Sequence, residues 1–180
     1  MRLVLELLLL FLLAACGGAA QTSPTTAPTT NATPVPATAA TAGNPTIQVT
    51  GDVSATVVAN NFYIAPVKAD DSTTIGTMLY LNQDDQRVLF IRFPWNAQPG
   101  AYQITQGFSD NYDGTTATGN YIDQTSGTMM QFAATGGTLT LDTTGNSYSG
   151  SYEFTAQDES GKSITISGTF SAIPFEPPAS

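Results

Sequence analysis

The sequence predicts an all-β fold for the part of the chain that runs from about Thr46 to Phe175. Several segments of this part alternate apolar and polar residues with a period of two, as half-buried strands do. Glycine, asparagine and aspartate interrupt these segments at short intervals, which is typical of tight turns. No long window carries apolar residues at helical spacing. We therefore expect a single antiparallel sandwich or open barrel over residues 46–175, with a short C-terminal tail at 176–180.

The first element of the chain is a short apolar run after Arg2. The run is about ten to thirteen residues long, whereas a helix that spans a bilayer needs about twenty. A positive charge followed by a short apolar core is typical of a secretory signal. The run ends in Leu13-Ala14-Ala15-Cys16, which resembles the lipobox of bacterial lipoprotein signal peptides. The resemblance implies that residues 1–15 are removed and that a diacylglyceryl group is attached to Cys16; the alternative is an ordinary secretory signal.

The use of cysteine agrees with a lipid anchor. Cys16 is the single cysteine of the chain, so no intramolecular disulfide can form. Two acyl chains hold a protein stably at a bilayer, whereas one chain gives only marginal binding. We expect a protein anchored to the cell membrane or the outer membrane through the lipid on Cys16, with its β domain outside the cytoplasm.

Residues 16–45 predict a disordered linker between the anchor and the domain. The segment after Cys16 consists largely of threonine, proline and alanine, and it contains no charged and no aromatic residue. Such a composition cannot bury enough apolar surface to offset the entropy lost on ordering. The linker either holds the domain away from the membrane or connects the two parts passively.

The N-terminal half of the domain predicts two hairpins. Residues 53–59 and 62–68 are expected to pair across a two-residue turn, Asn60-Asn61. Residues 74–81 and 87–93 are expected to pair around the polar loop 82–86, which places Leu79 opposite Leu89.

Both faces of the second hairpin are apolar, although an antiparallel sheet usually leaves one face in water. In the expected register, Tyr80 faces Val88 and Met78 faces Phe90 on the second face. Met78, Tyr80 and Phe90, with Trp95 close in sequence, are therefore candidate residues for a ligand groove or a partner surface. The alternative is that other strands or the Met129-Met130 segment cover this face.

The C-terminal part predicts a three-stranded meander. A hairpin that closes with Gly161 in the left-handed region pairs Phe154 with Ile166 and Tyr152 with Gly168, so that the apolar faces of both strands coincide.

The preceding strand of the meander is expected to join through a four-residue turn. This turn places Leu141 opposite Tyr148 and Gly137 opposite Tyr152. The Tyr152 ring would then cover a glycine on each neighbouring strand, an arrangement known as aromatic rescue.

Segments of the domain resemble small secreted bacterial lipoproteins, most of them of unknown function. The resemblance is carried by short pieces with a shared pattern of glycine, aromatic and hydroxyl residues: 93–102 (FPWNAQPGAY), 136–141 (GGTLTL), 147–154 (SYSGSYEF) and 168–171 (GTFS). It implies an all-β fold, and it supplies no catalytic residues.

The composition argues against most catalysis and against nucleic acid. The chain contains no histidine, which removes catalytic triads and metal sites built on histidine. A formal net charge of −9 disfavours binding to nucleic acid. We expect no enzymatic activity and no cofactor. A hydrolase that uses two carboxylates is the remaining catalytic alternative.

The loop at residues 109–114 offers oxygen ligands to a hard cation. Asp110 and Asp113 are candidate calcium ligands, although their spacing differs from that of an EF-hand loop. An ordinary turn of aspartate, asparagine and glycine is the alternative.

The sequence as a whole favours a lipid-anchored cell-envelope protein whose β domain has a non-enzymatic interaction or structural role. Its partner would be an unknown protein or glycan. The alternative is a small binding module for carbohydrate or an apolar ligand, which uses Trp95 and the face that carries Met78 and Phe90.

Overall fold

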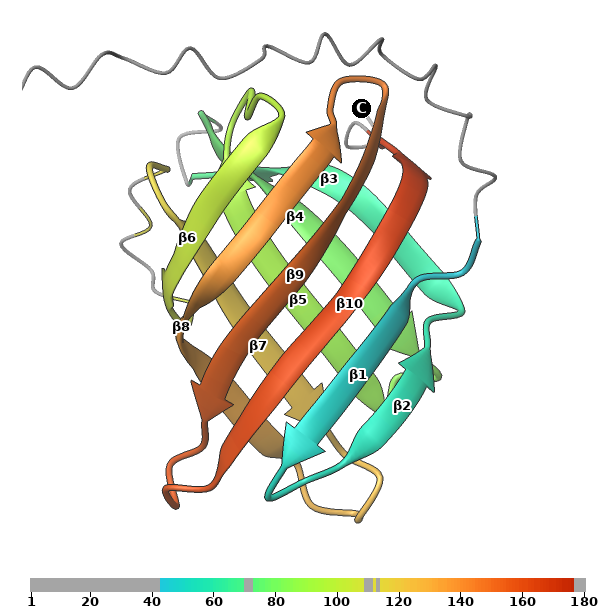
Figure 1. The fold of residues 1–180 in the computed structure, drawn as a ribbon, viewed down its shortest axis with the longest axis vertical. Coiled ribbons are helices and arrows are strands. Elements are labelled where there is room, and N and C mark those ends of the chain that lie inside the picture. The colour runs from blue at the N-terminus through green and yellow to red at the C-terminus, as the bar shows by residue number, and fades with distance from the viewer. Residues whose placement is uncertain (1–42, 70–72, 109–111, 113, 177–180) are drawn as a thin grey trace, which may run out of the picture. The chain divides into compact units, whose positions relative to one another are not determined.

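Ten strands and no helix build the described part of the protein, a computed structural model that covers residues 43–69, 73–108, 112 and 114–176. The strands form one strongly curled sheet, an open half-barrel (Figure 1), so the predicted all-β class is confirmed. The strands in chain order are β1 (Thr46–Gly51), β2 (Ala55–Val58), β3 (Asn61–Lys68), β4 (Thr74–Gln83), β5 (Arg87–Pro94), β6 (Gly100–Gln106), β7 (Ala117–Asp123), β8 (Met130–Thr143), β9 (Ser147–Gln157) and β10 (Ser163–Pro174).

Several predicted features lie outside the described residues: the signal peptide, Cys16, almost all of the linker, the candidate calcium ligands Asp110 and Asp113, and the last four residues of the tail. Among the residues that are described, no helix is long and apolar enough to cross a bilayer.

The spatial order of the strands is β2-β1-β10-β9-β8-β6-β7-β5-β4-β3. Neighbours run antiparallel, except that β6 and β7 run parallel. In Figure 1, β6, β8, β9, β10, β1 and β2 form the near wall, and β3, β4, β5 and β7 form the far wall. Strand β8 belongs to both walls, because its first residues pair with β7 and its later residues pair with β6.

The core lies inside the curl, where alternate side chains from both walls meet. Apolar side chains on the inner face are almost completely buried, as strict alternation requires. The largest of them are Tyr121, Phe93, Phe132, Phe154, Ile47, Ile64, Leu79, Leu81, Leu89, Ile91, Ile104 and Leu139.

The C-terminal hairpin has the predicted register. Phe154 lies opposite Ile166 and Tyr152 opposite Gly168. Gly161 has a φ of 88° in the turn, which is the left-handed conformation that glycine adopts without steric cost. The backbone N–H of Asp158 donates to the carbonyl oxygen of Lys162 at 3.0 Å and closes the loop.

The predicted register between β8 and β9 is wrong by two residues. Leu141 lies opposite Gly150 rather than Tyr148, and Gly137 lies opposite Phe154. A shift by two residues keeps every side chain on its face, so the apolar pattern cannot distinguish the two registers. The register also changes near the turn, between Leu141 and Thr143, which accommodates the difference.

The predicted register of the β4–β5 hairpin is also wrong by two residues. Leu79 lies opposite Ile91, and Tyr80 lies opposite Phe90. The turn is tighter than expected, because Asp84 and Asp85 adopt φ values of 51° and 57°. Aspartate tolerates this left-handed region better than most residues.

The predicted hairpin across Asn60-Asn61 does not exist. Strands β2 and β3 form opposite edges of the sheet order, since β2 pairs with β1 and β3 pairs with β4. The inward side chains change from odd positions before this turn, such as Ala59, to even positions after it, such as Ile64. The Asn60 backbone N–H donates to the carbonyl oxygen of Asn82 on β4 at 2.9 Å, so the chain turns a corner here instead of doubling back.

At Gly168, the Thr46 carbonyl oxygen and the Tyr152 hydroxyl lie closer to the backbone of β10 than a larger residue would permit. A β-carbon at this position would lie 2.2 Å from the Thr46 carbonyl oxygen and 2.4 Å from the Tyr152 hydroxyl. Gly168→Ala should therefore lower the free energy of unfolding by about 2 to 3 kcal/mol through overpacking. Urea unfolding followed by the fluorescence of Trp95, the single tryptophan, measures the loss.

Gly136→Ala is the matched control, because a β-carbon there meets no atom within 4 Å. We expect its stability to stay within about 0.5 kcal/mol of the parent protein. Equal losses in the two variants would contradict the close packing between Gly168 and Tyr152.

Candidate functional site

Four aromatic rings form a continuous row on the outer face of the far wall. The rings of Tyr63 and Tyr80 stack with centroids 4.7 Å apart and an interplanar angle of 20°. Phe90 follows at 5.2 Å from Tyr80, and Phe108 follows at 5.8 Å from Phe90. We call Tyr63, Tyr80, Phe90 and Phe108 the aromatic row.

The strand register positions this row. Tyr63 on β3, Tyr80 on β4 and Phe90 on β5 lie directly opposite one another, and Asn120 on β7 lies opposite Phe90. Phe108 comes from the segment after β6, and its backbone N–H donates to Oδ1 of Asn120 at 2.9 Å. This hydrogen bond places the Phe108 ring at the end of the row.

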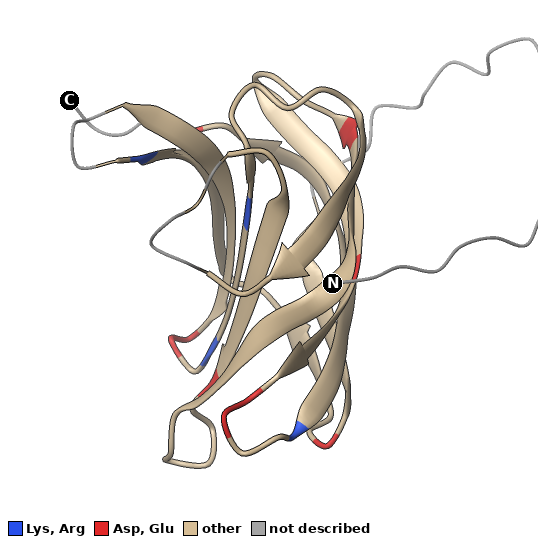
Figure 2. Ribbon diagram, turned by 90° about the vertical axis from the view of Figure 1, so that its left-hand side faces the viewer, with Lys and Arg blue, Asp and Glu red and all other residues tan. Residues whose placement is uncertain are grey.

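Arg92 extends the aromatic row on the same face. Its guanidinium carbon lies 4.0 Å from the centroid of the Phe108 ring, which is a cation–π contact. Met78 on β4 lies opposite Arg92 on β5. The four rings, Met78 and Arg92 are all half-buried. Among the described residues, most aspartate and glutamate residues lie near the ends of the strands (Figure 2).

Stacking covers part of the ring faces in the row. At 4.7 Å, Tyr63 and Tyr80 each cover one face of the other ring. A sugar that stacks on one of these two side chains would have to use the opposite face. Burial, followed by the neighbouring Tyr63 and Asp85, raises the pKa of Tyr80, so its phenol is a neutral hydrogen-bond donor at neutral pH.

The structure brings together three of the four predicted ligand-binding residues. Met78, Tyr80 and Phe90 share the outer face of β4 and β5. Trp95 lies elsewhere, beyond the end of β5, where its ring packs 5.8 Å from that of Phe175 and the residue is 39 % exposed. This contact agrees with a tryptophan that closes one end of the core.

The Met129-Met130 segment does not cover the aromatic row. Both methionines line a separate groove of about 420 Å³ together with Gln157, Asp158 and neighbouring residues. Met129 is 61 % exposed. Of the two alternatives for covering the apolar outer face, the one that uses this segment is therefore wrong.

Sequence reasoning missed Tyr63, Phe108 and Arg92 as members of the site. The sequence did not indicate that Tyr63 lies beside Tyr80, because β3 was expected to pair with β2 rather than with β4. Phe108 reaches the row through a crossing that needs Gly107, where a β-carbon would lie 2.6 Å from the Ala133 β-carbon. Only the packed structure shows this crossing.

Metal chemistry has no support in the described part of the chain. No three histidine, cysteine, aspartate or glutamate residues come together there in a way that could hold an ion. The predicted calcium ligands Asp110 and Asp113 lie outside the described residues.

A buried ion pair lies at the end of β5 and β7. Nε of Arg87 donates to Oδ2 of Asp123 at 3.0 Å, and Asp123 is 1 % exposed. Burial alone would raise the pKa of Asp123, but hydrogen bonds from the Thr125 hydroxyl and backbone, and from Arg87, outweigh it and lower the pKa below its ordinary value. Burial also raises the pKa of the neighbouring Tyr121 phenol, so this residue is neutral. The cluster has the features of a structural ion pair that closes one end of the core.

Arg87→Gln should lower the free energy of unfolding at pH 7 by about 2 to 4 kcal/mol, because it leaves a buried carboxylate without its ion pair. Since the pKa of Asp123 is depressed in the folded state, the pair stabilises the protein above about pH 4 and loses its effect as the pH falls through the folded value. The difference between variant and parent should shrink as the pH falls below the ordinary range of an aspartate carboxyl. Urea midpoints of both proteins, measured at pH 7 and through the acidic range, give this difference.

Lys162→Gln is the control, because it removes one positive charge from an exposed turn and breaks no ion pair with a buried group. A similar loss in both variants would show that net charge, rather than the buried pair, determines the effect.

No protein-family model, no curated protein and no solved structure matches this chain. The resemblance to secreted bacterial lipoproteins therefore depends on the lipobox-like segment and the short β-strand motifs alone.

Proposed function

We propose that this protein is a lipid-anchored cell-envelope module that has no enzymatic activity and binds a protein partner through the aromatic row. The observation that carries the proposal is the row itself: stacked, half-buried rings on the outer face of a sheet, with Arg92 and Met78 beside them. On a fully solvated face of an antiparallel sheet, polar side chains are expected instead.

The composition of this face supports a protein partner. Tyrosine, phenylalanine, methionine and arginine are enriched in the centres of protein–protein interfaces, whereas lysine, glutamate and aspartate are depleted there. Tyrosine and arginine are also enriched among the residues that contribute most to binding energy. The outward positions around Tyr80 on β4 and Phe90 on β5 carry this enriched set.

The partner is expected to dock onto the face rather than to extend the sheet. At the edge of β3, the carbonyl oxygen of Ile64 accepts a hydrogen bond from the Glu176 backbone N–H at 2.7 Å. Pro66 lies two residues further along the same edge and has no N–H to donate. A proline at an outward-facing edge position hinders the addition of another strand.

The carboxylates near the two surface hollows do not favour a hydrolase. The hollow over β8, β9 and β10 contains one acid, Glu153. The groove beside Met129 contains Asp158 and Glu159, but Asp158 accepts hydrogen bonds from Ser160 and from the Lys162 backbone within its own turn. A glycosidase needs two carboxyl groups that face each other across a cleft, about 5 to 10 Å apart.

A photo-crosslinking residue tests the proposed interface. We expect p-benzoylphenylalanine in place of Tyr80 to capture a discrete protein in cells that produce the full chain, because position 80 lies at the centre of the aromatic row. Adding Phe90→Ser should abolish the adduct. Mass spectrometry identifies the captured protein.

The matched control places the same photo-crosslinking residue at Thr165, on the outer face of β10. Equal adducts from both positions, or an adduct that survives Phe90→Ser, would exclude the aromatic row as the interface.

The lipid anchor is tested by Cys16→Ser. The serine variant has no thiol to receive the diacylglyceryl group, so it should stay in the aqueous phase of a detergent partition, whereas the parent protein should enter the detergent phase. Intact-mass measurement should show acyl groups on the parent protein alone. A parent protein without added acyl mass would rule out the anchor.

A further inference from the structure

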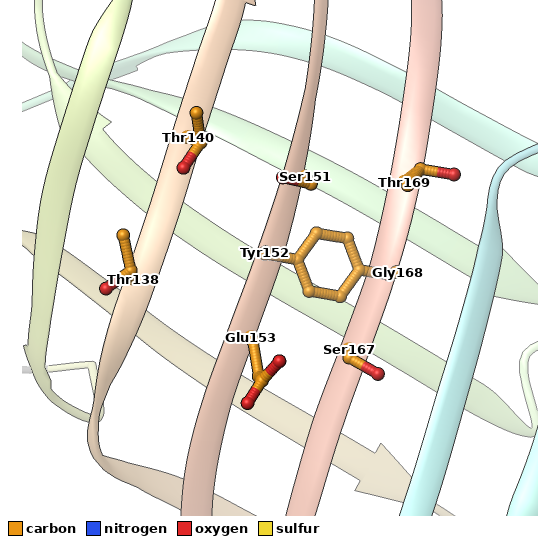
Figure 3. A pocket seen from close by; sticks show the side chains of 8 residues that line it. All are labelled: Thr138, Thr140, Ser151, Tyr152, Glu153, Ser167, Gly168 and Thr169. Atoms are coloured by element: carbon orange, nitrogen blue, oxygen red, sulfur yellow. The ribbon is translucent and has the colours of Figure 1, made fainter.

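A hollow of about 380 Å³ lies on the outer face of the near wall, over β8, β9 and β10. Figure 3 shows its polar lining, which comes from two outward side chains on each of the three strands. These side chains are Thr138, Thr140, Ser151, Glu153, Ser167 and Thr169. Gly168 and the ring of Tyr152, which lies between β9 and β10, form the floor.

The polar groups of the hollow are available to a ligand. Within the described residues, none of the six side chains forms a hydrogen bond or an ion pair with another residue. Elsewhere on the same wall, threonine hydroxyls do pair: those of Thr135 and Thr155 lie 2.9 Å apart. The hollow therefore keeps five hydroxyl groups and one carboxylate without partners from the protein itself.

We propose that this hollow binds a neutral glycan. Each serine or threonine hydroxyl both donates and accepts a hydrogen bond, as each sugar hydroxyl does. The carboxylate of Glu153 only accepts, and a charged acceptor forms stronger hydrogen bonds to hydroxyl groups than a neutral one. Outward side chains on neighbouring strands lie about 5 Å apart, which is comparable to the separation of hydroxyl groups on opposite sides of a pyranose ring.

The charge and the side chains of the hollow favour a neutral hydroxylated ligand. No lysine or arginine lines it, and Glu153 would repel an anionic sugar. Five of its side chains carry a hydroxyl group, and the Tyr152 ring beneath them adds an apolar surface of the kind that a sugar ring can contact. This site is independent of the aromatic row, since it lies on β8, β9 and β10, whereas the row lies on β3, β4 and β5.

Titration of the full-length, ¹⁵N-labelled protein in detergent micelles tests the proposal. The probes are maltohexaose, cellopentaose and mannopentaose, each to about 10 mM, with a hexagalacturonate as the anionic comparison. We expect amide shifts confined to residues 138–140, 151–153 and 167–169 with at least one neutral probe, and none with the anionic probe. Glu153→Gln should weaken the binding by about three- to tenfold.

A filling variant and its control complete the test. Ser151→Phe places a ring in the hollow and should abolish the shifts, whereas Thr165→Phe, on the outer face of β10 but outside the hollow, should preserve them. The proposal is overturned if no neutral probe shifts these amides, if the shifts map to Tyr80 and Phe90, or if they persist in Ser151→Phe. Absent shifts, or shifts that persist in Ser151→Phe, leave the proposed interface at the aromatic row untouched, whereas shifts at Tyr80 and Phe90 would place the sugar on that row.

Discussion

Close packing of aromatic rings against glycine is the constraint on which the curled sheet depends. Gly168 leaves room for the Tyr152 ring, and Gly137 leaves room for the backbone and β-carbon of Phe154. The Tyr152 hydroxyl then donates to the Thr46 carbonyl oxygen at 3.1 Å, so this side chain connects β9 to β1 beneath β10. Large rings set against positions without a side chain allow strongly curved strands to approach one another while the core stays filled.

The curl gives the sheet two outer walls with different chemistry. The near wall carries serine and threonine on its outer face, as expected where water is the neighbour. The far wall carries the aromatic row, Met78 and Arg92 on its outer face, while its inner face is equally apolar. When a strand is apolar on both faces, its outer face also has to be covered by another surface to be removed from water. This requirement is the physical basis of the proposed interface.

The two proposed binding surfaces fit the acidic character of the chain. Most carboxylates of the described residues lie in turns near the ends of the strands, whereas Glu153 lies on the near wall itself (Figure 2). A protein partner on the far wall would be held by the rings of the aromatic row, whereas a glycan on the near wall would be held by hydroxyl groups and by Glu153. The domain therefore has two chemically different outer surfaces, each with its own proposed ligand.

The all-β class, the inward and outward faces of most strands, and the hairpin that pairs Phe154 with Ile166 can all be predicted from the sequence. These features follow from alternation and from local turn chemistry, which a single segment already contains. The tertiary structure is needed to select which strands are neighbours, as the separation of β2 from β3 shows. The tertiary structure also sets the register that places Tyr80 opposite Phe90, and it brings the Phe108 ring to the end of the aromatic row. The reason is that a period of two specifies a face but not a partner: registers that differ by two residues bury the same side chains, and only turn geometry and packing across the curl select one of them.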